Sequence, residues 1–533
     1  MPTVREVTYD LFRKHSMTTM FGNPGSTELP MLQDYPDDFE YVLGLQEAAV
    51  VGMADGYAQA TGRPSLVNLH TAPGLGNAVG AIFNAQANHS PVVITVGQQV
   101  RAQIGIQANL TNRDAIRVAD PYVKFAYEPA RAEDVPQALA RAIHLATLPP
   151  KGPVMVSIPM DDWDMEMSAT DAALIVARDV EGGSGPDRAA IAALAERLAG
   201  ASNPVLIAGP DIDASGAWDE AIRLAESQSL PVWASPAPGG GRIGFPERHT
   251  SFRGILPPAI GPAGQSLEGH DLVLVVGSSV FPYYPYLPGP FLPEGTDLVA
   301  ITSDPDEAAR APMGDAIVGD VKLALNDLND LLEDSDRPAP ESIGDPPVPE
   351  ESDPVSPSMV HSILRRTLPE DGIAVLEAPS ATLSFRSQMR ISNPGSYFFG
   401  AGGGLGFGLS AAVGVQMAHP ERQVVCVIGE GSVQYAVTAF WTAATYRVPV
   451  VFLVERNEEY AILKWFQDIE QLTGSPGLDL PALDTAAIAS GYGIESTVAR
   501  TPEEIEAALS DAFGATDGPR LIEVPVSKGI SLF

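Results

Sequence analysis

The sequence predicts an α/β protein built from three doubly wound parallel-sheet domains. Two observations lead to this prediction. Short runs of Val, Ile and Leu alternate with helical patterns along the whole chain, which is typical of parallel sheets covered by helices on both faces. The length of 533 residues exceeds what one hydrophobic core usually organises and indicates about three domains.

Two stretches with few apolar residues divide the chain. Residues 335–357 are rich in Pro, Gly and acidic residues and indicate a linker, and residues 180–186 (VEGGSGP) indicate a weaker boundary. The predicted domains are therefore residues 1–180, 187–335 and 357–533. Their candidate strands are LVNLH, PVVITVG and PVMVSIP in the first domain, PVLIAG, LVLVVG and LVAIT in the second, and QVVCVIG and PVVFLVE in the third.

The first and third domains resemble each other in sequence. When the chain is shifted by 358 positions without a gap, eight of the 23 residues from 74 to 96 are identical. A duplicated α/β unit explains this match better than the general similarity of such units. We therefore expect loops at corresponding carboxyl ends of parallel strands, where open α/β sheets bind ligands.

Composition and charge exclude several classes of protein. The chain has 67 acidic and 32 basic residues and a net charge of −35, so we expect no nucleic-acid partner and no anionic membrane surface. No apolar run approaches the roughly 18 to 20 residues of a membrane span. The N-terminal segment is typical of an amphipathic helix and not of a signal peptide, so we expect a cytoplasmic protein. The single cysteine, Cys426, lies in a predicted buried strand and excludes an internal disulfide.

Chemistry-bearing residues follow two strands of the third domain. One strand ends in Gly429, Glu430, Gly431 and Ser432, and the next strand ends at Asn457. Glycines let the backbone approach an anion, and the following helix offers free N–H groups. Carboxylate and amide oxygens are ligands for a hard cation. The pattern predicts a diphosphate site bridged by Mg²⁺ or Ca²⁺.

This segment resembles the thiamine diphosphate motif, in which Gly-Asp-Gly is followed at similar spacing by an Asn-Asn pair. Five further segments resemble, in order, the thiamine-diphosphate-dependent 2-keto acid decarboxylases, and most closely the benzoylformate decarboxylases: FGNPGSTELP, LQEAAVVGMADGYAQATG, NLHTAPGLGNA, NPGSYFFGAGGGLGFGLSAAVGVQMA and FWTAATY. The resemblance implies a pyrimidine-binding domain, a Rossmann-like middle domain and a diphosphate-binding domain. It also implies a homotetramer with active sites at dimer interfaces.

The implied activity is non-oxidative decarboxylation of an aromatic 2-keto acid to an aldehyde and carbon dioxide, with covalent catalysis at C2 of the cofactor. By the resemblance, Glu47 activates the aminopyrimidine ring, Ser26 binds the substrate carboxylate and His70 transfers protons. Tyr284 stands where the family has a second histidine. Because a phenol exchanges protons less readily than an imidazole at neutral pH, protonation of the intermediate would depend on His70, Tyr284 or water.

The resemblance also implies the residues around the cofactor. Leu405 would prop the cofactor in a bent conformation, and the other cofactor-binding residues would be Ser380, Gly403, Gly404, Gly429, Gly431, Ser432 and Tyr460. The metal ligands would be Glu430, Asn457 and the backbone carbonyl of Glu459. The walls of an aryl pocket would be Leu110, Phe281, Phe399, Ile462 and Phe466.

Two departures from the family fall on the metal motif. Glu430 replaces the usual Asp and keeps the charge but reaches one methylene further, and Arg456 replaces the first Asn of the pair. Two alternatives stay open. The loss of the second histidine would permit a thiamine-diphosphate-dependent aldehyde carboligase or lyase, and the altered metal motif could mark a thiamine-fold protein without catalytic activity. The middle domain has no G-x-G-x-x-G after a strand, so we expect no dinucleotide there.

Overall fold

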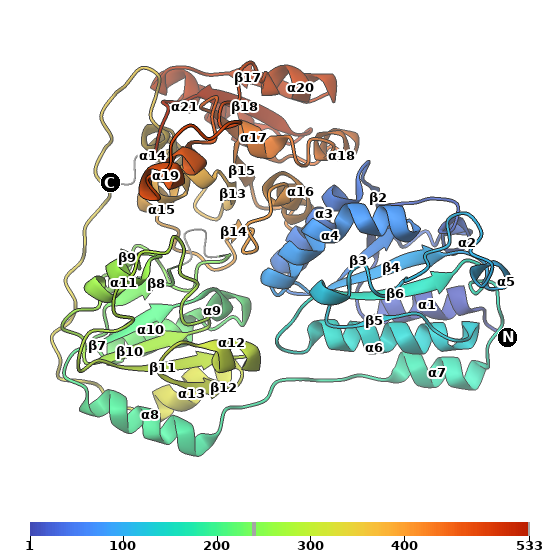
Figure 1. Cartoon of the computed structure of the whole chain (residues 1–533), viewed down its shortest axis with the longest axis horizontal. Coiled ribbons are helices and arrows are strands. Elements are labelled where there is room, and N and C mark those ends of the chain that lie inside the picture. The colour runs from blue at the N-terminus through green and yellow to red at the C-terminus, as the bar shows by residue number, and fades with distance from the viewer. Residues whose placement is uncertain (237–240, 531–533) are drawn as a thin grey trace.

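A computed structural model describes residues 1–236 and 241–530 of the chain. It contains three sheets of six strands each, in which all paired strands run parallel, with helices packed on their faces (Figure 1). This arrangement confirms the predicted fold class. In the described residues, no helix is long and apolar enough to cross a membrane.

The first sheet has the strand order β2-β1-β3-β4-β6-β5. Its strands are β1 (Thr19–Asn23), β2 (Glu40–Leu43), β3 (Ser65–Leu69), β4 (Val92–Gln98), β5 (Ala126–Tyr127) and β6 (Val154–Pro159). The helices of this region are α1 (Val4–Lys14), α2 (Leu29–Leu32), α3 (Glu47–Thr61), α4 (Thr71–Ala87), α5 (Arg101–Ile104), α6 (Val135–Thr147) and α7 (Ala169–Ala177). The expected N-terminal amphipathic helix is α1, which begins at a capping box of Thr3 and Glu6.

The middle sheet has the order β12-β11-β10-β7-β8-β9. When β7 to β12 are numbered 1 to 6 and the sheet is read from β9 to β12, the order is 3-2-1-4-5-6, as in Rossmann-like folds. The strands are β7 (Pro204–Ala208), β8 (Val232–Ala234), β9 (Phe252–Ile255), β10 (Leu272–Val276), β11 (Asp297–Thr302) and β12 (Asp315–Val318). The helices are α8 (Arg188–Gly200), α9 (Pro210–Ala214), α10 (Trp218–Ser227), α11 (Ile260–Ser266), α12 (Pro305–Arg310) and α13 (Val321–Leu331).

The third sheet has the order β14-β13-β15-β16-β18-β17. Its strands are β13 (Ile373–Glu377), β14 (Tyr397–Phe399), β15 (Val424–Gly429), β16 (Val451–Arg456), β17 (Glu495–Val498) and β18 (Arg520–Pro525). The helices are α14 (Pro357–Thr367), α15 (Thr382–Met389), α16 (Phe407–Ala418), α17 (Glu430–Val433), α18 (Ala439–Thr445), α19 (Ala461–Ile469), α20 (Thr485–Gly491) and α21 (Pro502–Gly514).

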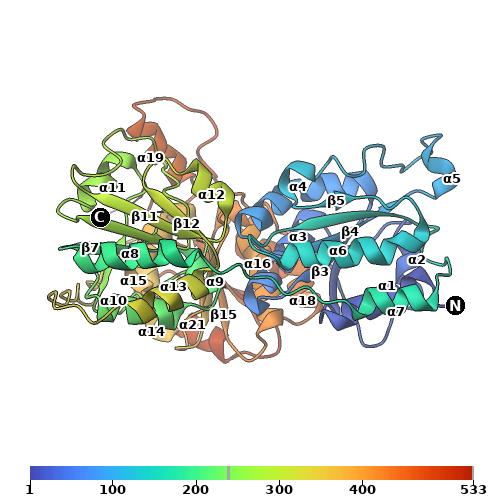
Figure 2. The same cartoon turned by 90° about the horizontal axis from the view of Figure 1, so that it is seen from below.

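The first and third sheets have the same topology. Counted within each sheet, both orders read 2-1-3-4-6-5, and the shift of 358 residues places β3 on β15 and β4 on β16. The sequence repeat therefore marks structurally equivalent strands. Two segments connect the sheets along the chain, one from α7 to α8 and one from α13 to α14. Both run along the outside of the molecule (Figures 1 and 2). The domain borders at residues 180, 187, 335 and 357 stay predictions.

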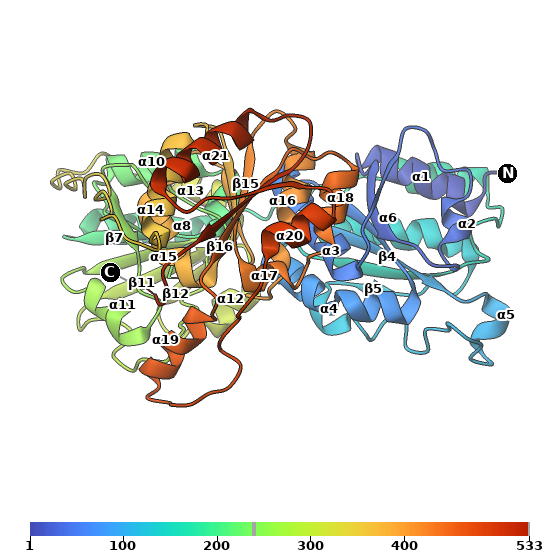
Figure 3. The same ribbon diagram turned by 90° about the horizontal axis from the view of Figure 1, so that it is seen from above.

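Helices α3 and α16 join the first and third sheets by packing directly on each other (Figures 1 and 3). Glycines make this contact close. A Cβ atom at Gly56 would lie 2.7 Å from the Cα atom of Ala411, and a Cβ atom at Gly414 would collide with the backbone carbonyl of Met53. Because backbone is in contact with backbone, neither position has room for a methyl group.

We expect Gly414→Ala to lower the apparent free energy of unfolding by about 1 to 3 kcal/mol, the usual cost of overpacking a core contact. The matched control is Gly200→Ala at the end of α8, where an added methyl group meets nothing within 4 Å. That variant should stay within about 0.5 kcal/mol of the unchanged protein. Urea denaturation followed by circular dichroism measures both. Equal midpoints for the two variants would show that the α3–α16 contact is not tight.

Candidate active site

One group of candidate residues lies at the carboxyl ends of the neighbouring strands β1 and β3. Glu47 is the first residue of α3, and only 8% of its surface is exposed. The side-chain amide of Asn77 donates to one carboxyl oxygen at 3.0 Å, and that of Asn23 donates to the other at 3.3 Å. Two amides from separate elements therefore fix the orientation of this carboxyl group.

His70 directly follows β3 and precedes α4. Its Nδ1 atom lies 2.9 Å from a carboxyl oxygen of Glu28 and 3.2 Å from the hydroxyl of Thr27. The Glu28 side chain is fully buried and also accepts a hydrogen bond of 2.7 Å from the backbone N–H of Gly25. Among the described residues, no hydrogen bond engages Nε2 of His70. Ser26 lies in the same loop and is exposed.

A second group lies at the carboxyl ends of the neighbouring strands β15 and β16. Glu430 begins α17 and is 2% exposed, and its burial raises the pKa of the carboxyl above the usual value. One oxygen of Glu430 accepts the backbone N–H of Glu458 at 2.6 Å, and the side-chain oxygen of Asn457 accepts that of Glu459 at 3.1 Å. Glu458 has a φ of 60°, a strained conformation for a non-glycine residue that is concentrated at functional sites.

The Arg456 side chain is neutralised by two carboxylates. It contacts Glu523 on β18 at 2.8 Å and Glu458 at 2.5 Å. The buried Glu523 also accepts the backbone N–H of Thr485 at 2.9 Å. The arginine at this departure from the family motif is therefore tied into the sheet by partners of opposite charge.

The other expected cofactor residues surround this second group. The hydroxyl of Ser380 accepts the backbone N–H of Ile462 at 3.1 Å. The ring of Tyr460 packs so closely on Gly431 that an added Cβ atom there would lie 3.0 Å from the ring. Gly403, Gly404 and Leu405 lie in the turn before α16, and Ser432 lies in α17.

The expected pocket residues come from different parts of the fold. Ile462 and Phe466 lie on α19, and the ring of Tyr284 from the middle domain lies 4.8 Å from that of Phe466, centre to centre. Tyr284 is 64% exposed. Phe399 ends β14, and Leu110 lies in the loop after α5 of the first domain.

The position of Phe281 differs from that of the other pocket residues. It is buried in the hydrophobic core of the middle domain and packs edge-on against Tyr283. This core packing occupies its side chain, which corrects the pocket position that the resemblance implied. Core and pocket residues are both apolar, so the sequence does not distinguish them.

The two groups share no direct polar contact within one chain. In residues 1–236 and 241–530, no hydrogen bond or ion pair joins the carboxyl of Glu47 or the ring of His70 to Glu430 or Asn457. The first and third domains meet mainly where α3 packs on α16. Each group lies at the strand ends of its own sheet.

Three family models describe this chain. They are the N-terminal thiamine pyrophosphate binding domain at residues 2–117, the central domain at residues 191–328 and the C-terminal thiamine pyrophosphate binding domain at residues 380–524. The chain belongs to the thiamine pyrophosphate enzyme family. Thiamine pyrophosphate is the same compound as thiamine diphosphate. The match accounts for both groups of site residues, since each lies in or beside one of the two cofactor-binding domains.

Relatives in this family match over the full length. Benzoylformate decarboxylase of Pseudomonas aeruginosa is 51% identical over 98% of this chain and 99% of its own. The structure of a thiamine diphosphate-dependent 4-hydroxybenzoylformate decarboxylase of Rhodococcus jostii RHA1 matches with a TM-score of 0.96 and 46% identity, covering 100% of both chains. The structure of benzoylformate decarboxylase from Polynucleobacter necessarius matches with a TM-score of 0.97 and 40% identity, also over 100% of both chains.

Sequence reasoning missed Glu28, which holds His70. The only signal was a lone carboxylate within the matched segment FGNPGSTELP. Its burial depends on Gly97 of β4, because a Cβ atom at that position would collide with the Glu28 carboxyl. The loop after β1 meets β4 only in the folded chain, so no sequence pattern could show that contact.

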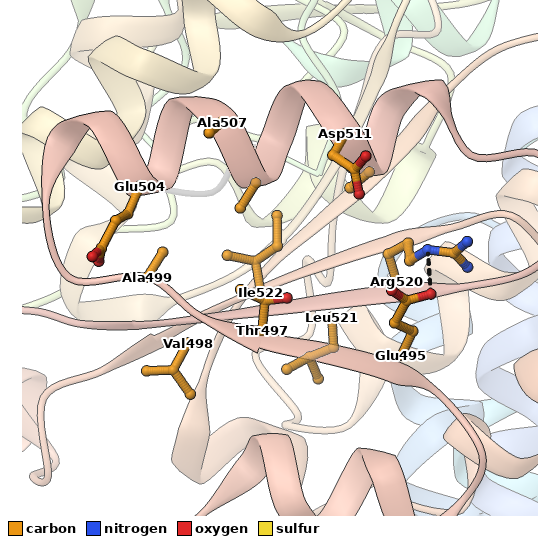
Figure 4. Close-up of a pocket in the computed structure, with 12 residues that line it drawn as sticks. Glu495, Thr497, Val498, Ala499, Glu504, Ala507, Asp511, Arg520, Leu521 and Ile522 are labelled. Atoms are coloured by element: carbon orange, nitrogen blue, oxygen red, sulfur yellow. Dashed lines mark ion pairs between the residues drawn. The ribbon is translucent and has the colours of Figure 1, made fainter.

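A surface groove lies apart from both groups. It has a volume of about 330 Å³ and runs between α21 and strands β17 and β18, where Arg520 pairs with Glu495 at 3.3 Å (Figure 4). None of the candidate site residues lines it. The groove therefore has no part in the candidate active site.

We expect Glu28→Gln to lower turnover about tenfold or more, because the amide replaces one acceptor for the His70 ring by a donor. Turnover is measured as carbon dioxide release from benzoylformate, the compound that appears in the names of two relatives. The matched control is Glu40→Gln, which alters an exposed side chain on β2 and should leave turnover unchanged. Equal activity in the two variants would remove Glu28 from the positioning of His70.

Proposed function

We propose that this chain is a thiamine-diphosphate-dependent decarboxylase that converts an aromatic 2-keto acid, of the benzoylformate type, to an aldehyde and carbon dioxide. One observation carries the proposal: the chain is 51% identical to a benzoylformate decarboxylase over nearly its whole length. The geometry supports it, because a buried carboxyl and a held histidine occupy one half of the site and a carboxylate–amide pair occupies the other.

Glu47 is the residue that would hold the aminopyrimidine ring of the cofactor. When bound, thiamine diphosphate supplies a nucleophilic carbon and an electron sink for the cleavage of a 2-keto acid. The side-chain amides of Asn23 and Asn77 donate to the Glu47 carboxyl and set its direction. Such a carboxyl group suits proton exchange with a ring nitrogen, since it is positioned before the cofactor arrives.

The second group suits the diphosphate and its metal. Glu430 is a buried carboxylate that receives backbone hydrogen bonds, and within the described residues no basic side chain forms an ion pair with it. Asn457 supplies an amide oxygen beside it. With the backbone carbonyl of Glu459, these are the hard oxygen ligands that Mg²⁺ or Ca²⁺ prefers. Gly429, Gly431 and Ser432 offer the backbone N–H groups at the start of α17 to phosphate oxygens.

The substrate would lie between His70 and the apolar side chains of α19. Phe466 and Ile462 favour a phenyl group, Ser26 would bind the substrate carboxylate, and Nε2 of His70 would donate or accept the proton. Tyr284 stacks near Phe466 and supplies a phenolic hydroxyl at the same wall. Leu110 and Phe399 would complete the pocket.

We also propose that two chains complete each site and that the enzyme is a homotetramer. The support is that, within the described part of one chain, no hydrogen bond or ion pair joins Glu47 or His70 to Glu430 or Asn457. A cofactor whose pyrimidine and diphosphate ends bind to different domains can be held between two subunits. A cytoplasmic location remains a prediction from the sequence.

A second candidate activity is carboligation, in which the carbon that remains after decarboxylation would bond to an aldehyde instead of to a proton. Tyr284 favours it, because a phenol delivers a proton at neutral pH less readily than an imidazole does. The two activities share the step that releases carbon dioxide and differ in their products.

We expect Glu47→Gln to lower the release of carbon dioxide from benzoylformate by at least about a hundredfold, the scale of losing a positioned acid–base group. The amide keeps the shape of the side chain, so bound thiamine diphosphate should be retained. Product analysis with added acetaldehyde separates the two candidates, since a hydroxyketone signals carboligation. Turnover comparable to that of the unchanged enzyme would contradict the role of Glu47, and no carbon dioxide from any aromatic 2-keto acid would contradict the proposed function.

We expect removal of divalent metal by dialysis against a chelator to weaken thiamine diphosphate binding about tenfold or more, because the diphosphate then lacks its cationic bridge. Calorimetric titration measures this, and added Mg²⁺ should restore the affinity. Glu430→Ala should bind the cofactor equally weakly with and without Mg²⁺, while the exposed control Glu421→Ala should behave as the unchanged protein. If metal-free protein held the cofactor as tightly as before, Glu430 and Asn457 would not be metal ligands.

A further inference from the structure

The turn that carries Leu405 is made almost entirely of glycine. Residues 400–406 read GAGGGLG, and Gly403 and Gly406 have φ values of 71° and 99°. Glycine loses more conformational freedom on folding than any other residue, so such a turn keeps one conformation only where other groups hold it. A side chain presented by this turn has a defined position only if its backbone is tied down.

Two amides from the first domain hold the start of the turn. The side chain of Asn88 accepts the backbone N–H of Ala401 at 2.8 Å. The side chain of Asn84 accepts the N–H of Gly404 at 3.0 Å and donates to its carbonyl at 2.8 Å. Both residues lie at the end of α4 or just after it. The first domain therefore fixes the turn on one side of Leu405.

Glu377 holds the other side of the turn. It is the last residue of β13, the strand between β14 and β15, and it is 5% exposed. One carboxyl oxygen accepts the backbone N–H of Gly406 at 2.8 Å, and the other accepts that of Gly408. The Ser432 side chain lies near enough to lower the pKa of this carboxyl in opposition to burial. A single side chain thus holds the turn before α16 and lies beside the start of α17.

The burial of Glu377 has a cost in stability. In the described part of the chain, no Lys, Arg or His forms an ion pair with it, and burial raises its pKa to about 7 against the opposing effect of the hydrogen bonds. A buried carboxyl without a cation is unfavourable unless hydrogen bonds compensate it. An apolar side chain would fill the same place at lower cost but could not accept the two N–H groups.

We propose that Glu377 is a positioning residue that fixes the glycine turn 400–406 and thereby sets where Leu405 stands relative to Ser432 in α17. The inference rests on the proposed function, in which Leu405 props the bound cofactor. Glu377 itself would touch neither the cofactor nor the substrate. It acts through the backbone N–H groups of Gly406 and Gly408, which flank Phe407, the first residue of α16.

The test is Glu377→Gln, with the exposed Glu370→Gln as a matched control in the same domain. Glutamine keeps the shape of the side chain, but its amide nitrogen is a donor and cannot accept one of the two backbone N–H groups. In the protein without cofactor, amide hydrogen exchange of the peptide covering residues 400–409 should become about tenfold faster or more, the scale of one lost hydrogen bond to a charged group. In the loaded enzyme, kcat should fall about tenfold or more, while KM for thiamine diphosphate changes less than about threefold, because the diphosphate contacts persist.

Glu377→Asp provides a second variant if the glutamine protein does not fold. It keeps the charge but is one methylene too short to reach both N–H groups, so exchange of the same peptide should rise. Unchanged exchange in the folded variants would overturn the inference, and so would faster exchange without a fall in kcat. If the unchanged enzyme had no decarboxylase activity, the proposed function would fail, but the exchange result would still report whether Glu377 holds the turn.

Discussion

The close contact between α3 and α16 is the constraint on which the rest of the site depends. Each helix begins at a residue that the cofactor would meet: α3 begins at Glu47, and α16 begins just after Leu405. Gly56 and Gly414 bring the two backbones together without intervening side chains. Because backbone atoms cannot rearrange as side chains can, the contact fixes the first domain relative to the third and leaves little freedom in the spacing of their strand ends.

Buried carboxyl groups then orient the side chains around these helix starts. Glu28 follows β1 and holds His70, and Glu377 ends β13 and holds the turn of Leu405. Strands β1 and β13 are equivalent in the two related sheets. Both carboxyls are shielded from water and accept backbone or side-chain hydrogen bonds, which orient their neighbours more strictly than apolar packing would.

The departures from the family motif are accommodated by local partners. The positive charge of Arg456 is matched by Glu458 and by the buried Glu523, so it stays within the sheet and the loop after β16. Tyr284 rests on the ring of Phe466 and joins the middle domain to α19. Both departures are thus held by partners within the fold.

The sequence by itself determined the fold class, the repeat and the family. Alternating apolar runs indicated the buried parallel strands. The motifs placed His70, Glu430 and Asn457 after strands and Glu47 before a helix, because these patterns lie in consecutive residues. Only the tertiary structure decided that Glu28 holds His70, that Glu377 holds the Leu405 turn and that Phe281 packs in a core. These facts depend on contacts between segments far apart in the chain, such as β4 against the loop after β1, and no local pattern records them.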